Sequence, residues 1–240
     1  MRQPVPADLA ARLEGRILCA IRRRAKYLLF DFPNGTLIVH LGMSGSLRVL
    51  PTDTPPQKHD HIDLIFEGDA CVRLRDPRRF GLMVWTSADP LAHPLLAHLG
   101  PEPWDPKFSA DYLTALAQAR PGPVKNFLMD GAVVVGVGNI YASESLHRAG
   151  IHPTRPARRI SRARYAGLVL AVREVLDAAI QLGGTTLRDF TQEDGKPGYF
   201  RNELRVYARA GEPCLQCGGT HIRQRVIGQR MSYFCPVCQR

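Results

Sequence analysis

Four cysteines near the end of the chain have the spacing with the clearest chemistry. Cys214 and Cys217 form one Cys-x-x-Cys pair, and Cys235 and Cys238 form a second pair after seventeen intervening residues. Two such pairs can supply four thiolates to one tetrahedral zinc ion, because each pair presents two sulfurs from one tight turn. Two disulfides are the alternative, but they need an oxidising compartment, and the N-terminus does not resemble a secretory signal. The spacing therefore predicts one zinc ion per chain.

The segment between the two cysteine pairs adds basic side chains to this centre. It alternates like two short strands around a turn near Gly228, and residues 201–240 hold seven arginines and two glutamates, a net charge of +5. Arg223, Arg225 and Arg230 would project from such a hairpin, which suits a phosphate backbone or a nucleic-acid groove. A solvated basic face is the alternative. Arg230 is the strongest candidate because a side chain extends furthest just past a turn.

The composition points to the same kind of partner. The chain of 240 residues is 45% apolar, enough for two or three modules with a real core, and its formal net charge is +10. Nucleic acid is favoured over a membrane surface, because the sequence has no long apolar run and no basic amphipathic helix with an aromatic face. These features fit a cytoplasmic protein. Cys19 and Cys71 lie among apolar residues and are expected to be core residues.

The first part of the chain is typical of antiparallel β-structure. A short helix is expected between Pro6 and Gly15 and a strand at residues 17–21, and the Asn34-Gly35 pair marks a hairpin. A second hairpin turns at Glu67-Gly68-Asp69, and a further strand is expected at residues 80–85. Residues 16–86 therefore predict a β-sandwich or barrel.

The second part of the chain has the periodicity of helices. Ser109 is expected to cap one helix, a short helix ends at Gly131, and a glycine-rich turn leads into a third helix that Gly150 closes. The longest helix is expected from near Ser161 to the glycine pair at 183–184. Its apolar face comprises Leu168, Ala171, Val172, Val175, Leu176 and Ala179.

Two groups of residues in these segments could contact phosphates. The turn Gly136-Val137-Gly138-Asn139 can direct backbone N–H groups at an anion, with Lys125 just upstream and Tyr141 at the helix start. Gly-x-Gly before a helix is also a common packing device. Lys26 leads an apolar strand, where the pattern alone favours a solubilising charge at a strand end, and a phosphate contact or a tuned amine is the alternative.

Three residues at expected loop tips could act on a base stack. Met43 lies between glycines, and Arg78 and Phe80 lie in the segment D-P-R-R-F-G. A thioether and an aromatic ring at the loop tips of a basic protein can wedge between bases. Ordinary packing under the sandwich is the interpretation that the pattern alone favours.

Eight segments of the chain, taken together and in their order, resemble the bacterial formamidopyrimidine-DNA glycosylases. The resemblance runs from about residue 4 to the end of the chain and is specific in aggregate. It implies an α+β protein with an N-terminal antiparallel β-sandwich, a helix-two-turn-helix module and a C-terminal zinc-finger β-hairpin. The related endonuclease VIII branch is a poorer match, because the wedge residues follow the formamidopyrimidine pattern. The segments that carry the resemblance are R-R-A-K-Y-L-L, H-L-G-M-S-G-S-L-R, K-H-D-H-I-D-L, D-P-R-R-F-G, V-G-V-G-N-I-Y-A-S-E, G-G-T-T-L-R-D-F, D-G-K-P-G-Y-F and the zinc hairpin.

The resemblance implies domains and a function. The domains are a β-sandwich at residues 1–100, a helix-two-turn-helix domain with a lesion-capping loop at residues 101–200, and a zinc finger at residues 206–240. The function is base-excision repair of oxidised purines in duplex DNA by a DNA glycosylase with AP lyase activity, which flips the damaged base out of the stack. One structural Zn²⁺, damaged double-stranded DNA as partner, a monomeric state and a cytoplasmic, nucleoid-associated location follow from it.

The resemblance also implies roles for individual residues. Met43, Arg78 and Phe80 match the residues that fill the gap left by the flipped base, with Arg78 facing the orphaned cytosine. Lys26 and Arg230 match residues assigned to proton transfer and phosphate contact during β- and δ-elimination. The loop around residues 185–200 matches the one that closes over an extruded 8-oxoguanine. The positions that match DNA contacts are His59, Arg78, Arg120, Lys125, Asn139, Tyr141 and Arg230.

The start of the sequence departs from the family pattern. The family opens Met-Pro-Glu-Leu-Pro-Glu, and its N-terminal proline is the nucleophile that forms a Schiff base with the sugar. Here Arg2 and Gln3 follow Met1, and the nitrogens of Pro4 and Pro6 are internal amides. The sandwich is therefore expected to lack its first strand, its first long helix and the nucleophile.

Three accounts follow from these observations. In the first account, the start codon was assigned too late and the gene encodes a complete glycosylase/lyase. In the second, the 240-residue chain binds DNA and abasic sites without base excision. In the third, it is a zinc-ribbon nucleic-acid-binding protein outside repair. The ordered motifs disfavour the last account. We expect the first for the gene and the second for the chain as written.

Overall fold

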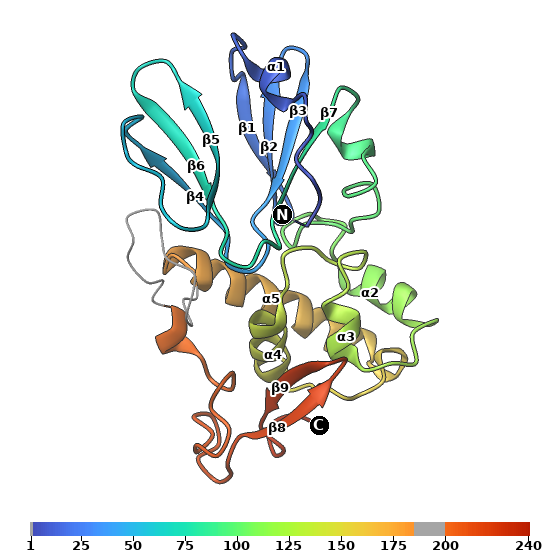
Figure 1. The fold of residues 1–240 in the computed structure, drawn as a ribbon. Helices are drawn as coiled ribbons and strands as arrows, with labels where there is room; N and C mark the ends of the chain where they lie inside the picture. The colour runs from blue at the N-terminus through green and yellow to red at the C-terminus, as the bar shows by residue number, and fades with distance from the viewer. Residues whose placement is uncertain (1, 185–199) are drawn as a thin grey trace. The chain divides into compact units, whose positions relative to one another are not determined.

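The computed structural model describes residues 2–184 and 200–240, and Figure 1 shows their elements. These residues fall into two compact units, one formed by residues 2–97 and the other by residues 98–184 together with residues 200–240. None of the described helices combines the length and apolar character needed to span a membrane.

The first unit contains two antiparallel sheets that face each other (Figure 1). The four-stranded sheet has the order β1-β2-β3-β7, and the three-stranded sheet has the order β4-β6-β5. The predicted β-sandwich is therefore confirmed. The strands are β1 (Ala20–Arg24), β2 (Tyr27–Phe32), β3 (Gly35–His40), β4 (Ser46–Leu50), β5 (Asp60–Phe66), β6 (Ala70–Arg75) and β7 (Leu82–Thr86).

Apolar side chains from both sheets meet between them. Leu37 and Val39 of β3 are fully buried in one cluster with Leu74 of β6, and the short helix α1 (Leu9–Leu13) adds Leu9 to it. Alternate residues of a strand point to the same face, so one face of β3 lines this core. Each such side chain contributes about 1.5–3 kcal/mol by leaving water. This apolar layer holds the loops between the strands in place.

Both predicted hairpins form, but the first strand begins later than predicted. In the first hairpin β2 pairs with β3 from Phe32 opposite Gly35, and in the second β5 pairs with β6. The strand predicted at residues 17–21 spans Ala20–Arg24 instead. Among the described strands it lies at the edge of its sheet with β2 as its one partner, and Cys19 beside it is exposed. The prediction that Cys19 is a core residue is wrong, whereas Cys71 is buried as predicted.

The second unit is built on four α-helices. The predicted caps form, since the hydroxyl of Ser109 accepts a hydrogen bond from the N–H of Tyr112 and that of Ser161 accepts one from Arg164. The predicted apolar face of the longest helix is buried. The helices are α2 (Ala110–Ala117), α3 (Val124–Leu128), α4 (Asn139–Arg148) and α5 (Arg162–Gln181), with short 3₁₀ turns at Ala157–Arg159 and Phe200–Glu203. A further 3₁₀ turn, Pro90–Ala92, belongs to the first unit.

The last two strands form the predicted hairpin. β8 (Arg223–Ile227) pairs with β9 (Arg230–Phe234) across the two-residue turn Gly228-Gln229, whose φ angles are +55° and +61°. Two positive φ angles are typical of the tight turn that matches strand twist. A Cβ atom on Gly228 would lie 2.5 Å from the side-chain oxygen of Asn126 in α3. The glycine therefore lets the hairpin tip approach the helix.

Candidate nucleic-acid interface and zinc centre

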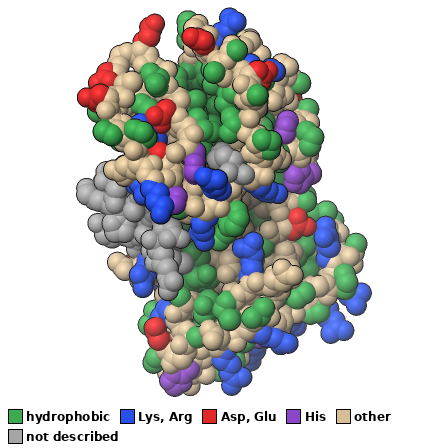
Figure 2. Space-filling view, in the orientation of Figure 1, with side chains coloured by type: hydrophobic (Ala, Val, Ile, Leu, Met, Phe, Trp, Pro, Cys, Tyr) green, Lys and Arg blue, Asp and Glu red, His purple; other side chains and the backbone are tan. Residues whose placement is uncertain are grey.

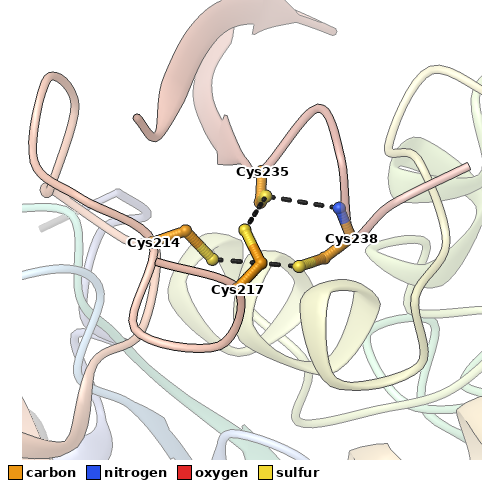
Figure 3. A group of neighbouring side chains, drawn as sticks. All are labelled: Cys214, Cys217, Cys235 and Cys238. Carbon is orange, nitrogen blue, oxygen red and sulfur yellow. Dashed lines mark hydrogen bonds between the residues drawn. The ribbon is translucent and has the colours of Figure 1, made fainter. Parts of the chain in front are cut away.

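The four predicted zinc ligands converge on one point (Figure 3). All four sulfurs lie within 4.8 Å of one another. The sulfurs of Cys214 and Cys238 are 3.9 Å apart, and those of Cys217 and Cys235 are 3.8 Å apart. A tetrahedral zinc ion with Zn–S bonds of about 2.3 Å has sulfur–sulfur edges of about 3.8 Å. The cluster therefore fits one structural Zn²⁺, and all four cysteines are free of disulfides.

The electrostatics of these thiols also call for a cation. Burial alone would raise the pKa of Cys214, but the backbone N–H groups of Gln216 and Cys217 and the nearby thiols outweigh it and lower this pKa to about 7. Burial and the neighbouring thiols raise the pKa of Cys238. Four adjacent thiolates repel one another, so a divalent cation is what allows all four to ionise together.

A buried lysine lies where the zinc hairpin meets the helices. Lys125 of α3 is 0% exposed, and its Nζ donates hydrogen bonds to Asn139 Oδ1 at 2.5 Å, to Ser232 Oγ at 2.6 Å and to the carbonyl of Met231 at 3.3 Å. Among the described residues no carboxylate pairs with it. Burial, and secondarily the charge of Arg230, lowers the pKa of Lys125 to about 8. The ammonium is thus bonded to neutral groups, with its charge uncompensated.

Asn139 joins this lysine to the glycine-rich turn. It is the first residue of α4, and besides accepting from Lys125 its amide donates to the carbonyl of Met231 at 3.0 Å and to the hydroxyl of Tyr207 at 3.4 Å. The preceding Gly136 has a φ of +83°, and no side chain caps the helix. The first N–H groups of α4 are therefore available to an anion. Lys125, Asn139, Ser232 and the carbonyl of Met231 are called the lysine node below.

The zinc hairpin exposes three arginines, one of which acts on the lysine node. Arg230 is exposed at the start of β9, and its charge reaches Lys125 strongly enough to lower the pKa of that lysine. Arg223 and Arg225 are exposed on β8. Figure 2 shows many Lys and Arg side chains and few acidic ones on this face of the second unit. A positive surface over an uncompensated ammonium is suited to phosphates.

Two other residues predicted to contact DNA have separate surroundings. Tyr141 is half-buried, and its ring meets that of Phe200 edge to face at 5.9 Å. Arg120 is exposed beyond α2, and its guanidinium lies 3.5 Å from the carboxylate of Asp130. Among the described residues no hydrogen bond or ion pair joins Arg120 to the lysine node, so a different part of a ligand would reach it.

The first unit brings the three predicted wedge residues onto two neighbouring loops. Met43 lies between β3 and β4, and Arg78 and Phe80 lie between β6 and β7. The side chains of Met43 and Phe80 are 63% and 50% exposed. Nε of Arg78 donates to the hydroxyl of Ser44 at 3.1 Å. The alternative that Met43 and Phe80 pack under the sandwich does not hold, because their large apolar side chains face solvent.

A buried aspartate holds the two wedge loops in register. The carboxylate of Asp76 accepts from the N–H of Gly81 at 2.7 Å and from the hydroxyl of Ser44 at 3.5 Å. Gly42 has a φ of +68°, and a Cβ atom there would lie 2.6 Å from the backbone of Phe80. The loops therefore touch through their backbones. Asp76 also donates its N–H to the carbonyl of His59 at 3.0 Å, which places this predicted DNA contact at the base of the same loops.

Lys26 lies in the tight turn between β1 and β2. Arg24 pairs with Tyr27 across this turn, and Ala25 takes the left-handed conformation with a φ of +54°. The side chain of Lys26 is exposed. Its charge, after the larger effect of burial, helps to lower the pKa of His40, whose ring contacts that of Tyr27 at 4.8 Å. The lysine is thus presented at a turn beside an imidazole whose pKa is lowered.

Sequence reasoning missed the residues that organise both sites. Asp76 was visible as the first residue of D-P-R-R-F-G, and an aspartate before a proline commonly organises a turn through its side chain. Ser232 carried no local signal, because its partner Lys125 is more than a hundred residues away in sequence. Glu144 of α4 is buried and accepts backbone N–H bonds from Arg205, Val206 and Tyr207 at 2.8–3.0 Å.

Comparison with known proteins identifies three consecutive matches along the chain. Residues 1–83 match the formamidopyrimidine-DNA glycosylase N-terminal domain, residues 99–191 match the formamidopyrimidine-DNA glycosylase H2TH domain, and residues 211–240 match a zinc finger found in FPG and IleRS. The formamidopyrimidine-DNA glycosylase of Methylococcus capsulatus is 60% identical over 240 residues, which are 100% of this chain and 88% of that protein. The chain belongs to the formamidopyrimidine-DNA glycosylase family.

Further relatives and solved structures agree with this assignment. The formamidopyrimidine-DNA glycosylase of Syntrophotalea carbinolica is 58% identical over the same coverage. The crystal structure of MutM (Fpg) from Thermus thermophilus superposes with a TM-score of 0.87 at 38% identity, covering 98% of this chain and 86% of that chain. The complex of Lactococcus lactis Fpg with abasic-site DNA gives a TM-score of 0.89 at 34% identity, covering 97% and 86%.

Membership of this family confirms several predictions and leaves others as predictions. The family, the fold and the zinc finger with its four cysteine ligands are confirmed. The loop expected to cap a lesion at residues 185–200 lies outside the described residues, except for Phe200. The DNA-contacting, wedge and catalytic roles of individual residues stay predictions.

Proposed function

We propose that the chain is a DNA glycosylase of base-excision repair that removes oxidised purines from duplex DNA and then cleaves the strand at the abasic site. The observation that carries the proposal is the lysine node, a buried ammonium without a carboxylate partner among the described residues, below an exposed arginine. Burying an unpaired charge is costly unless a ligand of opposite charge approaches it. The family assignment identifies that ligand as DNA.

The lysine node and Arg230 bind the phosphate backbone in this proposal. Arg230 contacts a phosphate directly. Lys125 attracts the phosphate through its charge and through its bond to Asn139, because its own Nζ is buried. The uncapped N–H groups of α4 approach the same anion. Contacts of this kind fix the register of the duplex and carry no sequence information.

The wedge loops make the contact that depends on the lesion. Met43 and Phe80 enter the base stack when the damaged nucleotide leaves it, replacing lost stacking by apolar contact. Arg78 donates to the acceptor edge of the orphaned cytosine. The bond to Ser44 aims the guanidinium in advance, so little side-chain freedom remains to be lost on binding.

Lys26 acts on the sugar after the base has left. Its amine attacks C1′ of the ring-opened abasic aldehyde and water is lost, which gives an imine that activates the adjacent C2′ proton. Loss of that proton expels the 3′ phosphate, and Arg230 supports this step by holding phosphate.

The same proposal covers domain organisation and location. We divide the chain into a β-sandwich domain at residues 1–100, a helix-two-turn-helix domain at residues 101–200 and a zinc finger at residues 206–240, supported by the three separate family matches. A protein whose substrate is chromosomal DNA is expected in the cytoplasm, associated with the nucleoid. A fluorescent fusion that stays uniformly dispersed, rather than following stained DNA, would contradict this location.

The decisive experiment follows excision and covalent trapping with this 240-residue chain. Duplexes carry 8-oxoguanine opposite cytosine, a natural abasic site, or no damage, and borohydride is added to trap imines. We expect a trapped adduct on the abasic duplex and loss of that adduct in Lys26→Gln, and cleavage of the 8-oxoguanine strand separates glycosylase activity from the DNA-binding alternative. Lys107→Gln, which changes an exposed lysine of the other unit, is the matched control.

The outcomes separate the alternatives. Tight binding of the damaged duplex without excision would reject glycosylase activity and favour the DNA-binding alternative. An adduct that persists in Lys26→Gln would reject the role of that lysine while leaving glycosylase activity intact. Equal binding to damaged and undamaged duplexes would reject the lesion-dependent role of the wedge loops.

A further inference from the structure

A buried histidine lies against the zinc centre and has no place in the function described above. His147 is on α4, it is 1% exposed, and its Nε2 lies 3.8 Å from the sulfur of Cys214. Its other ring nitrogen, Nδ1, is buried without a hydrogen-bond partner among the described residues. The zinc ligands themselves all come from the C-terminal segment, so this contact comes from outside it.

The surroundings of the ring decide which nitrogen carries its proton. If Nδ1 held the proton, a buried N–H would lack an acceptor, and the lone pair of Nε2 would face a metal-binding thiolate. With the proton on Nε2, the N–H points at an anionic sulfur, and only an acceptor is left unsatisfied. The second arrangement is favoured on both counts.

His147 is placed to support a ligand and not to replace one. The four cysteine sulfurs form the mutual cluster within 4.8 Å, and the imidazole does not belong to it. Among the described residues, the hydrogen-bond contact of its ring is to the sulfur of Cys214. An N–H bond to a coordinated thiolate withdraws charge from the sulfur and fixes its direction, which is what outer-shell partners of metal ligands commonly do.

We propose that His147 is a positioning residue of the zinc centre: its Nε2–H donates to the Cys214 thiolate and so ties the metal to helix α4. Among the described residues, two other side chains of the helix bond to the C-terminal segment: Asn139 donates to the carbonyl of Met231 and to the hydroxyl of Tyr207, and Glu144 accepts from the backbone of residues 205–207. Eight residues separate Asn139 from His147, about 12 Å along a helix. The zinc centre and the lysine node are thus fixed to the same rigid element.

The test compares three variants in the whole chain. His147→Phe keeps a planar ring but removes the donor, and His147→Gln places an amide N–H near the position of Nε2. His221→Phe makes the same substitution at an exposed histidine inside the zinc segment. The readouts are the rate of zinc transfer to a chelator, the ¹¹³Cd chemical shift of the cadmium-substituted protein, and the ¹⁵N shifts of the His147 ring in the parent.

We expect zinc transfer about tenfold faster in His147→Phe, within the range that loss of an outer-shell partner usually costs in metal affinity. The cadmium shift should move in the same variant. His147→Gln should restore both values toward the parent, and His221→Phe should change neither. In the parent, the ¹⁵N shifts should report the proton on Nε2.

Two results would overturn the inference. One is a ring protonated on Nδ1 in the zinc-loaded parent, which needs no variant to fold. The other is a cadmium shift and transfer rate in His147→Phe equal to those of His221→Phe. If His147→Phe fails to fold, the glutamine variant and the ring spectrum still decide the question.

Discussion

The lysine node and the wedge loops are built in opposite ways. The node buries its charge completely, and its bonds join α3, α4 and β9 across distant parts of the sequence. The wedge loops expose their apolar side chains, and buried groups such as Asp76 hold only the loop backbones. A buried node is rigid before DNA arrives, whereas exposed tips gain most of their contacts only when a base leaves the stack.

This contrast suggests a division of labour. Contacts to phosphate are the same for every duplex, so a preformed charged site raises affinity uniformly. Met43 and Phe80 find apolar surroundings only in a disrupted base stack, and Arg78 finds a free acceptor edge only on an unpaired base. These three residues therefore raise the preference for lesions. Damage to the second unit should thus lower all affinities together, and damage to the wedge loops should change their ratio.

The largest effect is expected from removing zinc. Cys235→Ser deletes a ligand, so the hairpin that carries Arg230 and Ser232 loses its fixed shape. Affinity for every duplex should fall by roughly two orders of magnitude, since several phosphate contacts depend on this segment. Metal analysis and fluorescence anisotropy measure both changes. Cys19→Ser, at an exposed thiol of the other unit, is the control and should behave like the parent.

The next effect concerns Lys125 and pH. Lys125→Met removes the buried charge while keeping most of its volume, so affinity for all duplexes should fall about tenfold. In the parent, phosphate favours the charged lysine, whose pKa is about 8 without DNA. Affinity should therefore decline as pH rises through 8, and anisotropy titrations from pH 7 to pH 9 should show the methionine variant with a flatter profile. Equal slopes in the two proteins would exclude an electrostatic role for this lysine.

The lowered pKa of Lys125 also determines how the stability of the DNA-free protein changes with pH. The folded pKa of Lys125 lies below the ordinary value of about 10.4 for an unfolded chain. Between these values the unfolded state binds more protons, so this lysine makes the free energy of unfolding rise with pH from about 8 to about 10. The free energies of unfolding of the parent and of Lys125→Met are measured by denaturant titration at each pH. Their difference isolates the contribution of this lysine, because the other titrating groups are common to both proteins.

A smaller uniform effect is expected from Arg230. Arg230→Ala should weaken binding to damaged and undamaged duplexes by a similar factor and lower the salt slope of affinity by about one. Arg223→Ala on the neighbouring strand tests whether position past the turn matters, and it should have the weaker effect. If both arginines lower affinity equally, the hairpin is a diffuse basic face, which is the alternative that the sequence left open.

The elements that local patterns determine were predictable, and the links between them were not. Asn34-Gly35 specified a hairpin, and Ser109 and Ser161 specified helix starts, because their partners lie within a few residues. The start of β1 and the exposure of Cys19 depend on which strands cover the edge of the sheet. The apolar residues around Cys19 therefore predicted burial wrongly.

The same distinction applies to the sites. The zinc ligands were predictable because two local pairs share one geometry. The wedge residues were noted at expected loop tips, but only the family resemblance favoured a wedge role over packing. Lys125 was predicted as a phosphate contact, but its burial against Ser232 was not, since no pattern within either segment points to the other. Asp76 and His147 escaped for the same reason: their importance comes from what the fold places beside them.

The smallest effect on affinity, and the sharpest on selectivity, is expected from Arg78. Arg78→Met keeps an unbranched stem but removes the donors that face an orphaned cytosine, so binding to undamaged duplex should change little. The preference for 8-oxoguanine opposite cytosine over 8-oxoguanine opposite adenine should fall by about fivefold to tenfold, the lower part of the range for one specific base contact. Competition binding with the two duplexes measures this ratio directly. Arg79→Met, on the same loop, controls for charge alone.

The comparison between the two variants tests the division of labour itself. If Arg79→Met lowers the ratio as much as Arg78→Met does, the loop contributes general charge, and the bond from Arg78 to Ser44 aims nothing. If Arg78→Met instead weakens all duplexes equally, the wedge loops belong with the phosphate site. The division of labour requires two results together. The ratio of affinities for the two 8-oxoguanine duplexes must change in Arg78→Met and not in Arg79→Met, and Lys125→Met must lower the affinity for all duplexes by a similar factor. These results would support a buried node that holds DNA and an exposed loop tip that distinguishes the lesion.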